Sequence, residues 1–99
     1  MLDKLAYTFS AKIWQHKSSS GWFFVSLPLK LSEEIRANLQ RQEERWGRMK
    51  AIARINDFSW NTSIWYDKKE EAHLLPLKSS ARMKAGLLAG DLVSVEINI

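Results

Sequence analysis

Apolar and polar residues alternate over several stretches of the chain, and this alternation predicts β-strands. Over residues 5–13 the odd-numbered positions are apolar and most even-numbered positions are polar, and residues 93–99 repeat the pattern. Successive side chains of a strand point to opposite faces of a sheet, so a period of two indicates a strand with one buried face. Alternating or aromatic-rich runs predict four more strands, at residues 22–27, 48–55, 58–65 and 72–78.

Turn-forming residues separate these runs. Asn56-Asp57 is predicted to form a two-residue hairpin turn, because both residues tolerate a positive φ angle. Gly90-Asp91 is predicted to turn the chain into the last strand. Pro28 ends the second strand, since proline has no N–H to donate to a sheet, and Pro76 interrupts the fifth for the same reason.

Two helices are predicted among the strands. Ser32 is a favourable N-cap for a helix over residues 32–45, and the two glutamates that follow it suit the positive end of the helix dipole. Ser79-Ser80 offers a cap for a helix of one or two turns that runs to Ala85, where Gly86 stops it. The helices are therefore few and short beside the strands.

These elements predict a mainly β architecture. Six strands are too much sheet for a helix bundle, and their spacing leaves no room for repeated βαβ crossovers. A closed or nearly closed barrel hides the sheet edges that a small β protein must protect. A chain of 99 residues is the size of one hydrophobic core, so a single barrel domain is predicted over residues 1–99.

A set of motifs distributed along nearly the whole chain resembles a known family. They occur in the order Gly21-Trp-Phe-Phe-Val-Ser-Leu-Pro28, Glu34-Ile35, Trp46-Gly-Arg48, Trp60-Asn-Thr-Ser63, Leu75-Pro-Leu-Lys78, Arg82 and Gly90-Asp-Leu-Val93. The chain is similar to a bacterial family of domains of unknown function, sometimes fused to a bacteriocin-protection (OmpD-associated-like) domain. That resemblance implies a double-split β-barrel, the fold of AbrB-type and MazE-type DNA-binding proteins, and it implies no activity. No second, fused domain is expected in these residues.

Composition narrows the possible functions. The chain has no cysteine, which excludes a disulfide, a cysteine zinc site and a cysteine nucleophile. The first twenty residues contain no continuous apolar block, so neither a signal peptide nor a membrane span is expected, and a cytoplasmic location is predicted. The net charge of +4 is spread along the chain, as in a mixed solvated surface.

One group of polar and aromatic residues suggests a binding site for an anion. An arginine fork matches a carboxylate or a phosphate, and a lysine adds a point charge. In the alternative, structural interpretation, the cations Lys78 and Arg82 form ion pairs with Asp91 or Glu96. The indole of Trp60 then belongs to the core. The candidate ligand-binding residues are Arg48, Trp60, Ser63, Lys78 and Arg82.

A nucleic-acid-binding module is the main competing hypothesis. Arg48, Lys50 and Arg54 alternate with apolar residues and therefore share one outer strand face. The five tryptophans offer stacking platforms for bases, although core packing is their commoner role. Trp14 and Trp65 lie opposite the apolar residues of their strands, so we expect these two to be exposed or to face a partner.

Signatures of an enzyme are weak. His16 and His73 have no carboxylate at a recognisable spacing, and no metal or phosphate-loop motif is present in the sequence. A Ser63/Lys78 pair of nucleophile and base is a last-ranked possibility. We therefore expect no catalytic residue, metal or cofactor. The expected partner is a small anionic ligand or a protein, and no association with a membrane is expected. The expected assembly is a monomer or weak dimer.

Overall fold

The computed structural model of the protein describes residues 6–17, 21–39 and 48–99. The described residues contain six strands and two helices. In chain order these are β1 (Ala6–Gln15), β2 (Phe23–Ser26), α1 (Leu29–Leu39), β3 (Arg48–Ile55), β4 (Phe58–Asp67), β5 (Ala72–Pro76), α2 (Ser79–Ala85) and β6 (Leu92–Asn98). All six strands predicted from the alternation of residues are confirmed.

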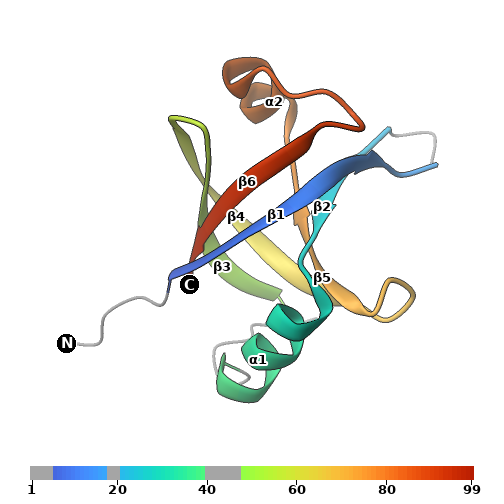
Figure 1. Ribbon diagram of the computed structural model, residues 1–99, viewed down its shortest axis with the longest axis vertical. Coiled ribbons are helices and arrows are strands. Elements are labelled where there is room, and N and C mark those ends of the chain that lie inside the picture. The colour runs from blue at the N-terminus through green and yellow to red at the C-terminus, as the bar shows by residue number, and fades with distance from the viewer. Residues whose placement is uncertain (1–5, 18–20, 40–47) are drawn as a thin grey trace.

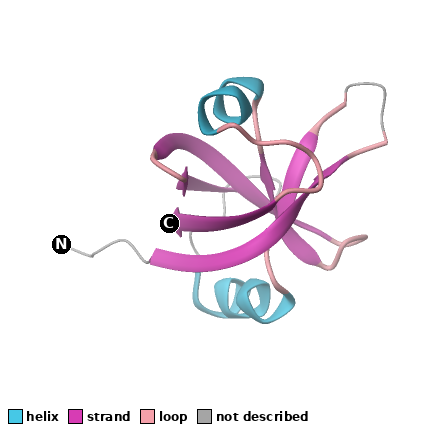
Figure 2. Cartoon of the chain, turned by 45° about the horizontal axis from the view of Figure 1, so that its top comes forward, coloured by secondary structure: helices cyan, strands magenta, loops and turns pink. Residues whose placement is uncertain are grey.

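The strands close into a barrel in the order β1-β2-β5-β4-β3-β6, and all neighbours are antiparallel. Figure 1 shows the strands wrapping around one interior, with α1 and α2 on opposite sides of the barrel. The tilted view in Figure 2 shows the same separation of the two helices. The predicted mainly β barrel with two helices is therefore confirmed.

The core fills the barrel from the inward positions of the alternating strands. In β3 the inward side chains are Met49, Ala51, Ala53 and Ile55, each at most 6% exposed, and β6 contributes three more aliphatic residues. Burying one large aliphatic side chain stabilises the folded state by about 1.5–3 kcal/mol. The period of two in the sequence thus corresponds directly to the interior and the exterior of the barrel.

Two turns lie where the sequence predicts them. Asn56 has a φ angle of 56° in the hairpin between β3 and β4, where Ile55 and Phe58 are paired. Gly90 has a φ angle of 91° before the last strand, a conformation that residues with a Cβ rarely adopt. These turns fix the register of β3 on β4 and return the chain to the barrel.

The first helix begins earlier than its sequence predicts. α1 starts at Leu29, and the N–H of Ser32 donates to the carbonyl of Pro28 at 2.9 Å, so Ser32 is inside the helix. Its buried Oγ accepts the backbone N–H of His73 at 2.8 Å, which ties the helix to β5. The predicted N-cap is therefore wrong, because this hydroxyl serves a strand rather than the helix end. The predicted helix end at residue 45 lies outside the described residues.

The second helix is confirmed, but its predicted serine cap is wrong. Lys78 occupies the N-cap position of α2, and no side chain caps the helix. Gly86 ends the helix with a φ angle of 68°, as its position in the sequence predicts. The N–H of Leu87 then donates to the carbonyl of Arg82 at 2.9 Å, which closes the last turn.

Candidate functional site

A cavity of about 300 Å³ lies where β2, β4 and the start of α2 come together. Its lining consists of residues 21–23, 60, 62, 76–79 and 82. Three of the five candidate site residues line it, namely Trp60, Lys78 and Arg82. The sheet brings them together because β5 pairs with both β2 and β4, and the N–H of Leu77 donates to the carbonyl of Phe23 at 2.9 Å.

Trp60 forms the buried wall of the cavity. It is 6% exposed on the inward face of β4 and stacks on Phe58, with ring centroids 5.7 Å apart and planes 17° apart. Its indole Nε1–H is buried and has no hydrogen-bond acceptor among the described residues. A buried donor without an acceptor costs about 1–3 kcal/mol, so an acceptor at this position would be stabilising.

Arg82 projects from α2 and is held in one orientation. Its Nε–H donates to the carbonyl of Leu77 at 3.2 Å, and its Cζ atom lies 3.8 Å from the centroid of the Phe23 ring. The cation is thus stacked on an aromatic face, an attraction of about 0.5–2 kcal/mol. This fixed geometry keeps the two terminal Nη nitrogens available for other acceptors.

Lys78 brings a second positive charge to the cavity. Within the described ranges, neither Lys78 nor Arg82 forms an ion pair. The acidic residues that the structural alternative assigns to them are occupied elsewhere: Glu96 pairs with Arg54, and the Asp91 carboxylate accepts the N–H of Leu88 at 2.9 Å. The cavity therefore carries two positive charges that no described carboxylate balances.

The family was identified by comparison with known proteins. The sequence profile of a domain of unknown function, DUF1905, matches residues 9–97. The chain belongs to the DUF1905 family. Every residue of the cavity lining falls inside the matched segment of this DUF1905 domain. No curated protein matches the chain significantly. The family description assigns no activity, so function has to be inferred from the residues themselves.

Trp22 and Phe23 line the cavity of the DUF1905 domain, although neither is among the five candidate ligand-binding residues. Trp22 is 52% exposed, contrary to the core role expected for most of the tryptophans, and it stacks on Phe24 with ring centroids 5.9 Å apart. Phe23 is half-buried beneath the Arg82 guanidinium. The sequence signal that could have identified these two lining residues is their position directly after Gly21, at the start of a strand.

Arg48 and Ser63 are not brought to this cavity. The Cζ atom of Arg48 lies 5.7 Å from the centroid of the Trp65 ring, on the outside of the barrel. Ser63 lines a second, more open cavity of about 600 Å³, together with Asn61 and Asn98. The two residues share the outer face of paired strands β3 and β4, whereas Trp60 faces inward. The candidate set therefore divides into three residues that line the cavity and two residues on the outer strand face.

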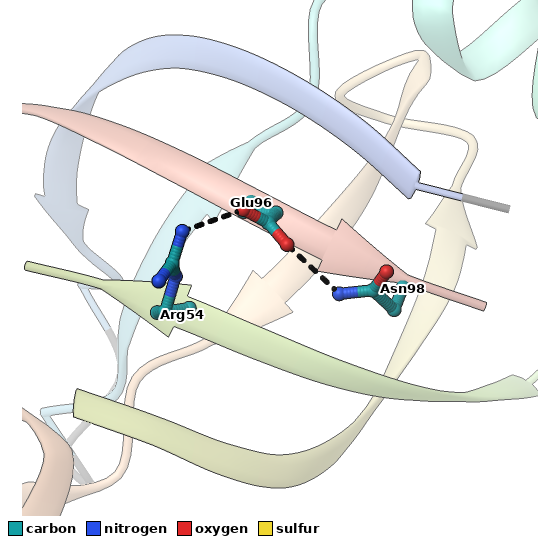
Figure 3. Close-up of polar contacts among 3 residues, drawn as sticks. All are labelled: Arg54, Glu96 and Asn98. Carbon is teal, nitrogen blue, oxygen red and sulfur yellow. Dashed lines mark hydrogen bonds and ion pairs between the residues drawn. The ribbon is translucent and has the colours of Figure 1, made fainter. Parts of the chain in front are cut away.

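The basic strand face is present, but part of its charge is neutralised. Arg48, Lys50 and Arg54 are exposed on the outer side of β3, as predicted. The Nη2 atom of Arg54 lies 2.8 Å from Oε1 of Glu96, whose Oε2 accepts the Asn98 amide at 3.2 Å (Figure 3). These hydrogen bonds, first from Asn98 and then from Arg54, lower the pKa of the Glu96 carboxyl and keep it ionised.

Trp14 and Trp65 are half-buried on the outside of the barrel, which agrees with their predicted orientation. The Nε1–H of Trp14 donates to Oγ of Ser26 at 2.9 Å, and both indoles pack against Phe24. Phe24 thus forms the centre of an outer aromatic cluster. Because these rings cover one another, they offer less stacking surface than their number suggests.

The two histidines lie in different environments. His16 is exposed and His73 is fully buried, with its Nδ1 at 3.1 Å from Oγ of Ser32. Burial, and then the charge of Arg36, lowers the pKa of His73 to about 4. No group of three potential metal ligands occurs among the described residues, and none of the described helices is long and apolar enough to cross a membrane.

Proposed function

We propose that this DUF1905 domain binds a small anionic molecule in the cavity between β2, β4 and α2. The observation that carries the proposal is the pair of cations, Lys78 and Arg82, at a cavity where no described carboxylate pairs with either one. A cavity of about 300 Å³ is at the small end of the range for ligand sites in proteins. The expected ligand is therefore a small molecule with a carboxylate or phosphate group.

The two cations have different roles in this proposal. Arg82 is already oriented by Phe23 and Leu77, so little side-chain freedom is lost when its Nη nitrogens bind two oxygens of the anion. Lys78 contributes a point charge that follows the anion on a flexible stem. The aromatic walls lower the local dielectric constant around the half-buried Arg82, which strengthens its attraction for the anion relative to water.

Two observations favour the cavity over nucleic-acid binding by the outer basic face. Arg54 is paired with an ionised glutamate, and Arg48 lies beside the Trp65 ring. Each contact reduces what these residues offer to a phosphate backbone. Binding of DNA by Arg48, Lys50 and Arg54 stays the competing outcome of the test.

The test is a thermal-shift screen with inorganic phosphate, small carboxylates, small phosphate esters and short single- and double-stranded DNA. A ligand at about 100 times its Kd stabilises a protein by about 2.7 kcal/mol, which raises the Tm of a domain this size by about 10–20 °C. We expect small carboxylates or phosphates to raise the Tm of the wild type. The increase should be lost in Arg82→Gln and reduced in Lys78→Gln.

Lys84→Gln is the matched control, because it removes one positive charge from the same helix at an exposed position outside the cavity lining. Its ligand-induced increase in Tm should equal that of the wild type. An equal loss in Lys84→Gln and Arg82→Gln would mean that net charge, and not the cavity, attracts the anion. A shift with DNA alone that disappears with salt and in Arg48→Gln would overturn the proposal in favour of the basic face.

A further inference from the structure

Three of the ten residues that line the cavity are aromatic, and these rings restrict the ligand further. Three of the lining residues are Trp22, Phe23 and Trp60. Aromatic rings offer flat apolar faces with a negative centre and a positive edge, and they favour other rings in offset or edge contacts. A cavity that combined cations with aliphatic walls would lack this preference. The aromatic walls therefore bear on the shape of the ligand as well as on its polarity.

Two of the three rings are already engaged. The face of Phe23 is covered by the guanidinium of Arg82 at 3.8 Å, and Trp60 is buried and stacked on Phe58. Trp22 differs, because it remains 52% exposed even though Phe24 stacks against it. An accessible indole beside two cations has the properties of a contact surface. Trp22 is therefore the lining residue most able to receive a ring.

We propose that the ligand is an aryl anion, in which a carboxylate or a phosphate is attached to or lies close to an aromatic ring. The inference rests on the proposed function, because it names the class of molecule for the same cavity. Arg82 and Lys78 bind the charged group, and the ring lies against the indole of Trp22. The cavity volume of about 300 Å³ accommodates one ring system with its charged group.

The experiment compares pairs of ligands that differ in the ring alone. Benzoate is paired with cyclohexanecarboxylate, and phenyl phosphate with cyclohexyl phosphate, so charge and approximate size stay constant within each pair. Isothermal titration calorimetry at constant ionic strength gives the Kd of each. A ring contact is worth about 2- to 10-fold in affinity beyond apolar burial, so the aromatic member of each pair should bind about 2- to 10-fold more tightly.

Trp22→Leu tests the position of the ring. This variant keeps an apolar side chain at an exposed position, and the preference for the aromatic member should fall to about 1-fold, with binding of the saturated member retained. Leu88→Ala is the control, since it changes an exposed apolar residue outside the lining and should leave the preference intact. Comparison of the two pairs tells whether carboxylate or phosphate is the favoured group.

The outcomes separate the inference from the proposed function. If both members of each pair bind equally and Arg82→Gln abolishes binding, the inference is overturned and the proposed function stands. If the aromatic preference persists in Trp22→Leu, the ring does not lie on Trp22 and the inference is overturned as well. If none of the four compounds binds the folded protein at millimolar concentration, both the proposed function and the inference fail.

Discussion

The buried His73 makes the stability of the protein dependent on pH in a defined window. His73 is 0% exposed, and burial together with the charge of Arg36 lowers its pKa from 6.5 to about 4. Its Nδ1 lies 3.1 Å from Oγ of Ser32, and its Nε2 has no hydrogen-bond partner among the described residues. The folded environment therefore favours the neutral imidazole, because a charged ring would lose its hydration without gaining an acceptor.

The direction of the effect follows from the two pKa values. Between pH 6.5 and pH 4 the unfolded chain takes up a proton at His73 and the folded chain does not, so the free energy of unfolding falls as the pH falls. The loss begins near the pKa of the unfolded state and is complete below the pKa of the folded state. At about 1.4 kcal/mol per pH unit, the difference between 6.5 and about 4 corresponds to about 3 kcal/mol.

The assay is urea denaturation at a series of pH values from 7 to 4, with His73→Asn as the reference. Asparagine keeps a polar atom near the position of Nδ1 and does not titrate in this range. The wild type should lose about 3 kcal/mol more than His73→Asn over the window. His16→Asn is the control, because this histidine is exposed, and its pH dependence should match that of the wild type.

If the free energy of unfolding depends on pH equally in the wild type and in His73→Asn, burial does not lower the pKa of His73. If His73→Asn does not fold, titration of the wild-type His73 ring by NMR gives the same test. A ring that is neutral at pH 5 agrees with the account, and a midpoint near 6.5 contradicts it.

Three further predictions concern packing and backbone. In urea denaturation, Trp60→Ala should lower the free energy of unfolding by about 3–5 kcal/mol and Trp22→Ala by less than about 1 kcal/mol, since Trp60 is buried and Trp22 is half exposed. Similar losses in the two variants would contradict the inward orientation of Trp60. Ser32→Ala should cost about 1–3 kcal/mol and speed hydrogen exchange of the His73 amide, because that N–H loses its acceptor. Gly86→Ala should lower the free energy of unfolding by about 1 kcal/mol in the same assay, because alanine disfavours the φ angle of 68° at this position. The added Cβ contributes no steric clash to this cost, since no atom lies within 4 Å of it.

The barrel is predictable because its strands follow a local rule. In β3 every inward residue is apolar, and the hairpin turn that follows contains Asn56 at a φ angle of 56°, so pattern and turn agree. Ser32 shows the limit of such rules. Its capping propensity is real, but its partner is His73 in a strand 41 residues further along the chain, and local sequence carries no information on that contact.

The candidate site is predictable in part for a related reason. Trp60 faces inward on β4 and Ser63, three positions later, lies on the outer face, so alternation separates two residues that motif order groups together. The sequence identifies Arg82 as a cation near Lys78. It does not predict that Arg82 stacks on Phe23, because this contact depends on how α2 is positioned against β2.

The most direct test of the central claim is an NMR titration of the labelled wild-type protein with phenyl phosphate. The largest chemical-shift changes should occur at the Nε–H of Arg82, the indole N–H of Trp22 and the backbone amides of Leu77 and Lys78. Amides of β3 should change little. Shifts confined to β3, or no shifts at millimolar ligand, would contradict the claim that this cavity binds small anions.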